Sequence, residues 1–180
     1  LAQLALQGTL ALGVDGTVGT GGVSSALDFL ADVNQVDVNL LFAEQTDGSV
    51  TVPNKIIQIA GTTRKDCVGF ISCDTTSDAE DEVIADFQSL SSTSYVVLDS
   101  SAVYVYNKYT DQYQYIPAAG HIAGLCARTD NTNDPWFSPA GYNRGQLLGV
   151  SKLKFNPNQT ERDALYKKGI NPIVAQPGQG

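Results

Sequence analysis

Residues 120–145 read GHIAGLCARTDNTNDPWFSPAGYNRG and contain the only tryptophan of the chain, Trp136. The first part of this stretch, 120–128, is apolar and has helical length, whereas the second part is a turn-rich loop punctuated by proline and glycine. The loop also carries Arg144. A planar guanidinium near an aromatic ring is a combination that suits docking against another protein surface. The stretch therefore predicts a helix followed by a contact loop, and it offers few side chains for acid–base chemistry.

Strand-like and helix-like segments alternate on both sides of this stretch. Apolar runs of strand length are residues 36–43, 67–73, 95–98 and 173–175, and those at 36–43 and 67–73 predict strands that are covered on both faces. A further strand is expected at 151–155, and residues 102–116 alternate as a hairpin that turns at 108–112. Helical spacing occurs at residues 23–33, 53–63, 77–90 and 158–168, and the second of these helices is expected to bury the apolar stripe Ile56, Ile57, Ile59 and Ala60. This alternation predicts an α/β fold, with a layered, mostly parallel sheet flanked by helices and an added β-hairpin.

Each predicted helix has a residue that suits its first turn. Serine and asparagine cap helices through their side-chain oxygens, a glutamate three residues later completes a capping box, and proline fits the first turn. The residues in question are Ser24 or Ser25, Pro53, Ser77 with Glu80, and Asn158 with Glu161.

The length of 180 residues suits one domain. We expect the α/β core over residues 23–180, preceded at 1–22 by a strand (9–14) and a glycine-rich connector. The glycine spacing of the connector matches neither a dinucleotide-binding fingerprint nor a P-loop. The chain has no methionine and ends in AQPGQG, so we expect an internal piece of a longer polypeptide.

The net charge of −8 argues against a dedicated nucleic-acid binder. Residues 1–143 carry five basic and seventeen acidic side chains, whereas residues 144–180 carry six basic and two acidic ones. Two interpretations stay open: a solvated charged helix and loop, or opposite-signed surfaces of identical subunits that meet head to tail. No apolar run reaches the roughly 18 residues of a membrane span, so membrane insertion is not expected.

The residues typical of metal and cofactor sites lack the required spacing. Cys67, Cys73 and Cys126 lie in apolar runs and are expected to be free thiols, and with His121 they match no common zinc pattern. The acidic residues at 78–82 are better explained by a helix start than by a calcium loop. We therefore expect no metal and no cofactor.

A hydrolase remains an alternative of another class. Any Ser-His-Asp triad must use His121, the only histidine. The string PAAGHIAG looks like the helix after the nucleophile in subtilisin-type proteases, where the serine lies five residues before the histidine. Here that position is Ile116. We therefore assign no catalytic residue.

The tyrosines of the hairpin allow two interpretations. Alternation places Tyr104 and Tyr106 on one face, opposite Val103 and Val105. They could form a stacking platform for nucleic acid, or they could pack across strands and serve an interface. The second is favoured because only Lys108 is basic nearby.

Four strings carry a resemblance to a known family. They are ALDFLADVNQVDVNLLFAE (26–44), VYVYNKYTDQYQYIPAAGHIAGLCARTDN (103–131), PWFSPAGYNRGQ (135–146) and ERDALYKKGINPIV (161–174). Together they resemble the subtilisin-like domain of the tail sheath proteins of contractile-tailed (myovirus-type) bacteriophages.

The resemblance implies a structural subunit without catalytic activity. Copies would polymerise as stacked rings around the tail tube and contract, driving the tube through the host envelope for genome delivery. Implied partners are further copies, the tail tube protein, and the baseplate and tail terminator proteins, within a virion tail assembled in the host cytoplasm. The N-terminal, insertion and C-terminal regions of the family would be absent, with the arms that join neighbouring subunits.

Two alternatives accompany this expectation. The sheath of a phage-derived bacteriocin or contractile injection system would share the same strings, and a subtilisin-like serine hydrolase is the alternative of another class. The expected inter-subunit contacts are Trp136, Arg144, Lys152 and Lys154, for which local bracing and solvation is the competing role.

Overall fold

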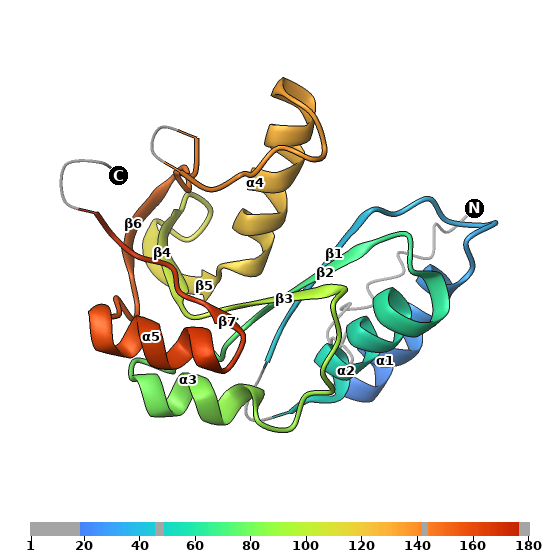
Figure 1. Cartoon of the computed structure of the whole chain (residues 1–180), viewed down its shortest axis with the longest axis horizontal. Helices are drawn as coiled ribbons and strands as arrows, with labels where there is room; N and C mark the ends of the chain where they lie inside the picture. Colours follow the sequence, from blue (N-terminus) through green and yellow to red (C-terminus); the bar gives the residue numbers. More distant parts are fainter. Residues whose placement is uncertain (1–18, 46–48, 142–143, 177–180) are drawn as a thin grey trace, which may run out of the picture.

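The centre of the fold is a parallel sheet with strand order β1–β2–β3–β7 (Figure 1). The computed structural model describes residues 19–45, 49–141 and 144–176, and all statements on structure refer to these ranges. The strands are β1 (Leu40–Glu44), β2 (Val68–Ser72), β3 (Val96–Asp99) and β7 (Ile170–Asn171). The mostly parallel α/β sheet predicted from the sequence is confirmed.

The first and last strands lie elsewhere than predicted. Strand β1 begins at Leu40 rather than at residue 36, and β7 is Ile170–Asn171 rather than 173–175. Pro172 follows β7 directly and has no N–H to donate to the ladder, so pairing stops there. The N–H of Ile173 donates instead to Ser100 Oγ at 3.0 Å. The strand predicted at 9–14 lies outside the described residues.

Helices cover both faces of the parallel sheet, unequally (Figure 1). Four helices pack on one face, and α4 alone packs on the other. The helices are α1 (Thr20–Leu27) with a 3-10 turn (Asp28–Ala31), α2 (Thr51–Gln58) with a π-helical extension (Ile59–Arg64), α3 (Glu80–Phe87), α4 (Ala119–Thr132) and α5 (Gln159–Lys167).

The core lies mainly on the face that carries four helices. One cluster joins β2 to α3 and α5, and a second cluster joins β1 to α2. They comprise Ile57, Ile71, Cys73, Val83, Phe87, Phe155, Leu165 and Ile170, and Leu41, Ile56, Ile59, Ala60 and Cys67. On the opposite face a smaller cluster holds Phe70 against Ala119 and Ala123 of α4. The apolar stripe predicted for α2 is therefore confirmed as buried.

Only one of the predicted serine and asparagine caps is formed. Asn158 accepts from the Glu161 N–H at 3.1 Å and Glu161 accepts from the Asn158 N–H at 2.7 Å, which completes the capping box. Ser77 does not cap α3, whose N-cap is Ala79, because its hydroxyl donates to Asp86 Oδ2 at 2.8 Å.

The first helix starts earlier than predicted. Its N-cap is Gly19, so both Ser24 and Ser25 lie inside the helix, and the Ser25 hydroxyl donates to the Gly21 carbonyl. Pro53 does occupy the first turn of α2. Helix α4 continues to Thr132, beyond the predicted end at residue 128.

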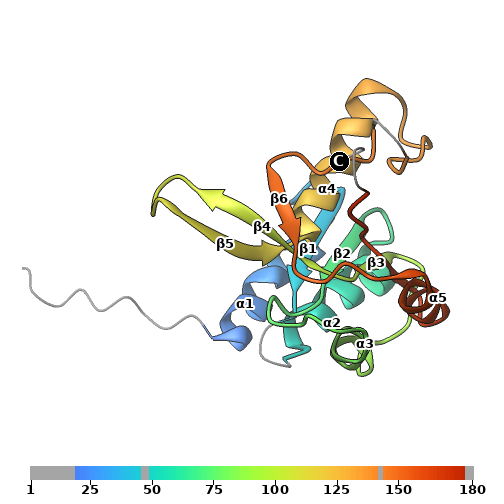
Figure 2. The same cartoon turned by 90° about the vertical axis from the view of Figure 1, so that its left-hand side faces the viewer.

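A second sheet, antiparallel, has strand order β5–β4–β6. Its strands are β4 (Ala102–Asn107), β5 (Gln112–Pro117) and β6 (Val150–Leu153), with a register shift between Tyr104 and Val105 where β6 joins β4. The predicted hairpin is thus confirmed. Figure 2 shows the β4–β5 hairpin projecting from the body of the molecule.

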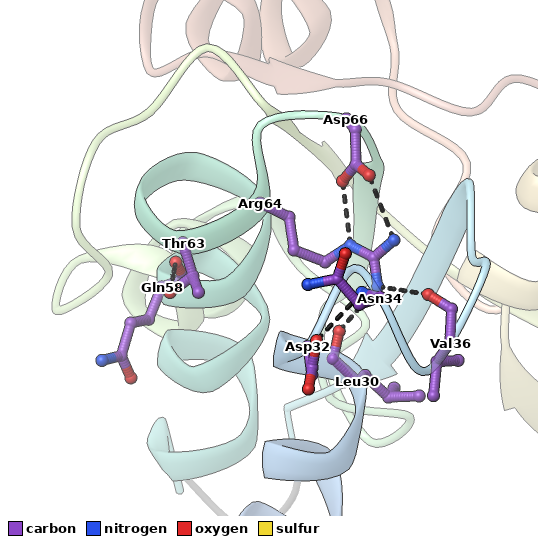
Figure 3. Close-up of polar contacts among 8 residues, drawn as sticks. All are labelled: Leu30, Asp32, Asn34, Val36, Gln58, Thr63, Arg64 and Asp66. Atoms are coloured by element: carbon purple, nitrogen blue, oxygen red, sulfur yellow. Dashed lines mark hydrogen bonds and ion pairs between the residues drawn. The ribbon is translucent and has the colours of Figure 1, made fainter.

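A buried arginine fixes the chain ahead of the first strand (Figure 3). The Arg64 guanidinium binds both carboxylate oxygens of Asp66, at 2.9 and 3.1 Å. Its Nη1 donates to the carbonyl oxygens of Leu30 and Val36, each at 2.8 Å. The hydrogen bond from Arg64 holds the pKa of Asp66 below its ordinary value. Arg64 therefore ties the segment between α1 and β1 to the end of α2.

Candidate functional site

The four residues predicted to contact other subunits lie in two separate places. Trp136 and Arg144 belong to the loop after α4, and Lys152 and Lys154 lie on or just after β6. Within the described part of the chain, no hydrogen bond, ion pair or ring contact joins the two pairs. The structure therefore forms two candidate surfaces instead of one.

The loop after α4 holds an exposed aromatic cluster. Trp136 is 79% exposed, and its ring meets that of Phe137 edge-on at 5.9 Å between centroids. The Arg144 guanidinium lies over the same Phe137 ring, 4.7 Å from its centre. We call Trp136, Phe137 and Arg144 the aromatic knob. The predicted proximity of an arginine and an aromatic ring is confirmed, with Phe137 between Arg144 and Trp136.

Hydrogen bonds brace the backbone beneath the knob. Arg144 Nε donates to the Ala140 carbonyl at 2.8 Å, and the Gly145 N–H donates to the Gly141 carbonyl at 2.7 Å. Arg128 of α4 donates to the Arg144 carbonyl at 2.8 Å. Gly141 has a φ of 124°, which residues with a side chain rarely adopt. The knob is thus held by local contacts while its tryptophan faces outward.

The second surface is the tyrosine face of the antiparallel sheet. Tyr104 lies opposite Tyr115 and Tyr106 opposite Tyr113, and ring centroids are 4.7 and 5.2 Å apart in the two pairs. Lys152 Nζ lies 4.6 Å from the centre of the Tyr104 ring. The prediction that these tyrosines pack across strands is therefore confirmed.

The outer end of this face is exposed and its inner end is tied to the body. Tyr106 and Tyr113 are about half exposed. Lys154 Nζ lies 5.2 Å from the Tyr115 ring centre and 3.7 Å from Asp78 Oδ2. Lys152 and Lys154 thus both have partners within the chain, and both side chains remain at least partly exposed.

A groove runs along α4 on the side of the strand β1. Its volume is about 740 Å³, and its walls are mostly apolar. Phe42 of β1 lies in this groove and is 62% exposed, so the predicted burial of both faces of this strand is wrong at Phe42. Glu44, His121 and Arg128 add polar groups to the rim. We call this hollow the α4 groove.

Comparison with known proteins identifies the family. The phage tail sheath protein central domain matches residues 19–180. The chain belongs to this phage tail sheath family. It is 36% identical over 193 residues to the tail sheath protein of Vibrio phage KVP40, and 36% identical over 200 residues to that of Enterobacteria phage T4. These alignments cover 93% and 98% of the chain, but only 29% and 30% of the two relatives.

Solved structures with the same fold come from a contractile particle. The present chain matches a chain of the anti-feeding prophage baseplate with a TM-score of 0.61 at 19% identity, covering 93% of this chain and 42% of that one. It also matches the helical sheath of the anti-feeding prophage in the contracted state, with a TM-score of 0.60 at 20% identity, covering 93% and 43%. At this identity the match establishes the shared fold.

A buried serine–aspartate contact in the described part of the chain joins two strands to α4. Ser72 Oγ donates to Asp99 Oδ2 at 2.7 Å and accepts from the Ala119 N–H at 2.7 Å. Burial raises the pKa of Asp99 to about 7. This contact links β2 and β3 to the first turn of α4. The Ser72 hydroxyl proton is directed at Asp99, and His121 lies half-buried in the α4 groove, where burial lowers its pKa.

The described residues contain neither a membrane-spanning helix nor a cluster of metal-binding side chains. None of the helices is long and apolar enough to cross a bilayer. Likewise, no group of three or more His, Cys, Asp or Glu side chains in these ranges could hold a metal ion. Cys67 and Cys73 are buried free thiols as predicted, whereas Cys126 is a free thiol only partly buried.

Sequence reasoning missed the α4 groove and the Ser72–Asp99 contact. The groove combines residues of β1, the end of β5, α4 and the segment 146–148, which are far apart in the sequence. The signal available in advance was Asp99 itself, an acidic residue at the end of a buried apolar run. A carboxylate in that position must find partners or shift its pKa.

Proposed function

We propose that the chain is the central part of a contractile tail sheath subunit. Copies polymerise around the tail tube and contract, and contraction drives the tube through the host envelope for genome delivery. The match of residues 19–180 to the phage tail sheath central domain carries this proposal. The fold shared with an anti-feeding prophage sheath in its contracted state supports it.

The architecture suits a subunit that moves as one body. Two helical layers enclose the parallel sheet. Asp99 joins β3 to β2 through Ser72, and Arg64 fixes the segment ahead of β1. Contraction then requires two packings of the same body that differ in contact free energy. A few kcal/mol for each subunit suffices, because a long polymer sums the differences.

The remaining parts of the proposal concern partners and chemistry. The sheath binds the tail tube protein and ends at the baseplate and at tail terminator proteins, in a virion assembled in the host cytoplasm. The subunit catalyses no reaction and needs no cofactor. Trp136, Arg144, Lys152 and Lys154 contact neighbouring subunits, with the knob and the tyrosine face as two distinct contact regions.

Electron microscopy of the full-length polypeptide that carries this chain tests the proposal. Expressed alone, it should form long hollow cylinders. A serine-directed covalent probe should leave the protein unlabelled. Dispersed particles that hydrolyse a substrate and react with the probe would overturn the sheath proposal in favour of a hydrolase.

A further inference from the structure

The aromatic knob has the properties of an interface anchor that lacks a partner within the chain. Trp136 is 79% exposed although large apolar side chains normally gain by burial. Trp and Arg dominate the binding energy of many interfaces. The hydrogen bonds beneath Arg144 and Gly145 hold the backbone in place before any contact forms. An anchor held this way loses little conformational entropy on binding.

The α4 groove has the complementary shape and chemistry. Its apolar walls come from Phe42, Leu125, Leu147 and Leu148, of which Phe42 and Leu148 are more than 60% exposed. A volume of about 740 Å³ can admit an indole ring with its neighbours. These walls are an apolar surface that nothing in the described part of the chain covers.

One acidic side chain of the groove can pair with an incoming cation. Glu44 lies at the β1 end, and its carboxylate has no hydrogen bond or ion pair within the described ranges. Arg128 lies at the other end, where it is bonded to the carbonyl oxygens of Arg144 and Gln146. An arginine that enters beside Glu44 gains an ion pair with this carboxylate, whereas the Arg128 guanidinium is bonded to backbone carbonyl groups.

We propose that the aromatic knob of one copy docks into the α4 groove of a second copy. Trp136 contacts the apolar walls and Arg144 pairs with Glu44. Trp136 is absent from the residues that line the groove of its own molecule, so it is available to a neighbour. The contact joins two different surfaces, so it can be repeated from copy to copy and build a ring or a helical array. This inference rests on the proposed sheath function and names the surface that receives the knob.

A charge exchange tests the pairing. In analytical ultracentrifugation the wild-type chain should associate with increasing concentration, and Arg144→Glu and Glu44→Arg should each weaken association by at least about tenfold. An equimolar mixture of the two variants should recover association, because every knob then meets a groove of opposite sign. Circular dichroism and thermal unfolding verify that each variant folds.

Two further variants distinguish specific docking of the knob from non-specific association through exposed aromatic side chains. Trp136→Ala should weaken association as strongly as the charge reversals. Tyr166→Ala removes an aromatic ring that is equally exposed, at 77%, but lies on α5 outside knob and groove, and should change nothing.

Several results would overturn the inference. They are a wild-type chain that stays monomeric at all concentrations, charge variants that associate like wild type, or a mixture no better than its components. None of them decides the sheath proposal, which stands or falls with the cylinders formed by the full-length polypeptide.

Discussion

The two sheets of this molecule differ in composition and in burial: the strands of the parallel sheet are mainly aliphatic, whereas the antiparallel sheet carries four tyrosines. In the parallel sheet, the central strand β2 is buried on both faces from Gly69 to Ser72. In the antiparallel sheet, β4 is buried only at its start, and Tyr106 and Tyr113 leave about half of their surface in solvent. The parallel sheet therefore stabilises the fold, whereas the antiparallel sheet presents a surface.

The manner in which each sheet is held explains this division. Parallel sheets in α/β proteins need helices on both faces, and such burial gives the largest hydrophobic gain. The tyrosine face is held instead by ring contacts and by Lys152 above Tyr104. Such contacts contribute about 1 kcal/mol each, and they leave the outer ring surfaces available to a partner.

The largest effect is expected from the centre of the parallel sheet. Ile71→Ala removes a fully buried side chain between α3 and α5 and should lower the free energy of unfolding by about 2–5 kcal/mol. The free energy of unfolding can be measured by chemical denaturation monitored by circular dichroism. A loss no greater than that of Tyr113→Ala would contradict the division between the sheets.

A pH-dependent effect of somewhat smaller size is expected from Asp99. The pKa of Asp99 is about 7 in the folded state and roughly 4 in the unfolded state. Between these two pH values the folded protein therefore keeps a proton on Asp99 that the unfolded protein has lost. Stability should therefore fall by a few kcal/mol as the pH rises from about 4 through about 7. Asp99→Asn should flatten this dependence in unfolding curves measured at several pH values. An unchanged slope would show that Asp99 is not responsible.

An intermediate effect is expected from Gly69 in β2. A Cβ atom at this position would lie 2.7 Å from Ile56 Cγ2 and 2.9 Å from Val96 Cγ2. Gly69→Ala should therefore destabilise the chain by about 1–3 kcal/mol through overpacking. Gly124→Ala serves as a matched control, because a Cβ there meets nothing within 4 Å. Equal unfolding midpoints for the two variants would contradict the tight packing of β2.

The smallest effect on stability is expected from the tyrosine face. Lys152→Ala removes the cation above Tyr104 and should cost no more than about 1 kcal/mol. We expect its main effect on the assembly of the full-length polypeptide, measured as cylinder length by electron microscopy. A large loss of stability without a change in assembly would reverse the roles given to the two sheets.

Features set by local sequence could be predicted. The continuous apolar runs predicted β2 and β3, and the Asn158–Glu161 box depends only on neighbouring residues. Long-range contacts defeated the other predictions. Ser77 has the sequence position of a helix cap, but its hydroxyl donates to Asp86 instead. The carbonyl groups that Arg64 binds belong to residues 28 and 34 positions away in the sequence.

The candidate site followed the same rule. Trp136 and Arg144 are close in sequence, so their place in one loop could be predicted, but the ring that contacts both side chains is Phe137, which the sequence did not single out. The position of Lys152 above Tyr104 depends on the pairing of β6 with β4. The groove depends on four segments that only the tertiary fold brings together, so no local pattern could indicate it.

A single indole gives this protein a built-in optical reporter. Because Trp136 is the only tryptophan and lies mostly in water, its fluorescence reports on one point of the molecular surface. Transfer of that ring to an apolar environment would shift its emission to shorter wavelengths, while unfolding would leave the emission nearly unchanged. Association could thus be followed in real time, without any added dye.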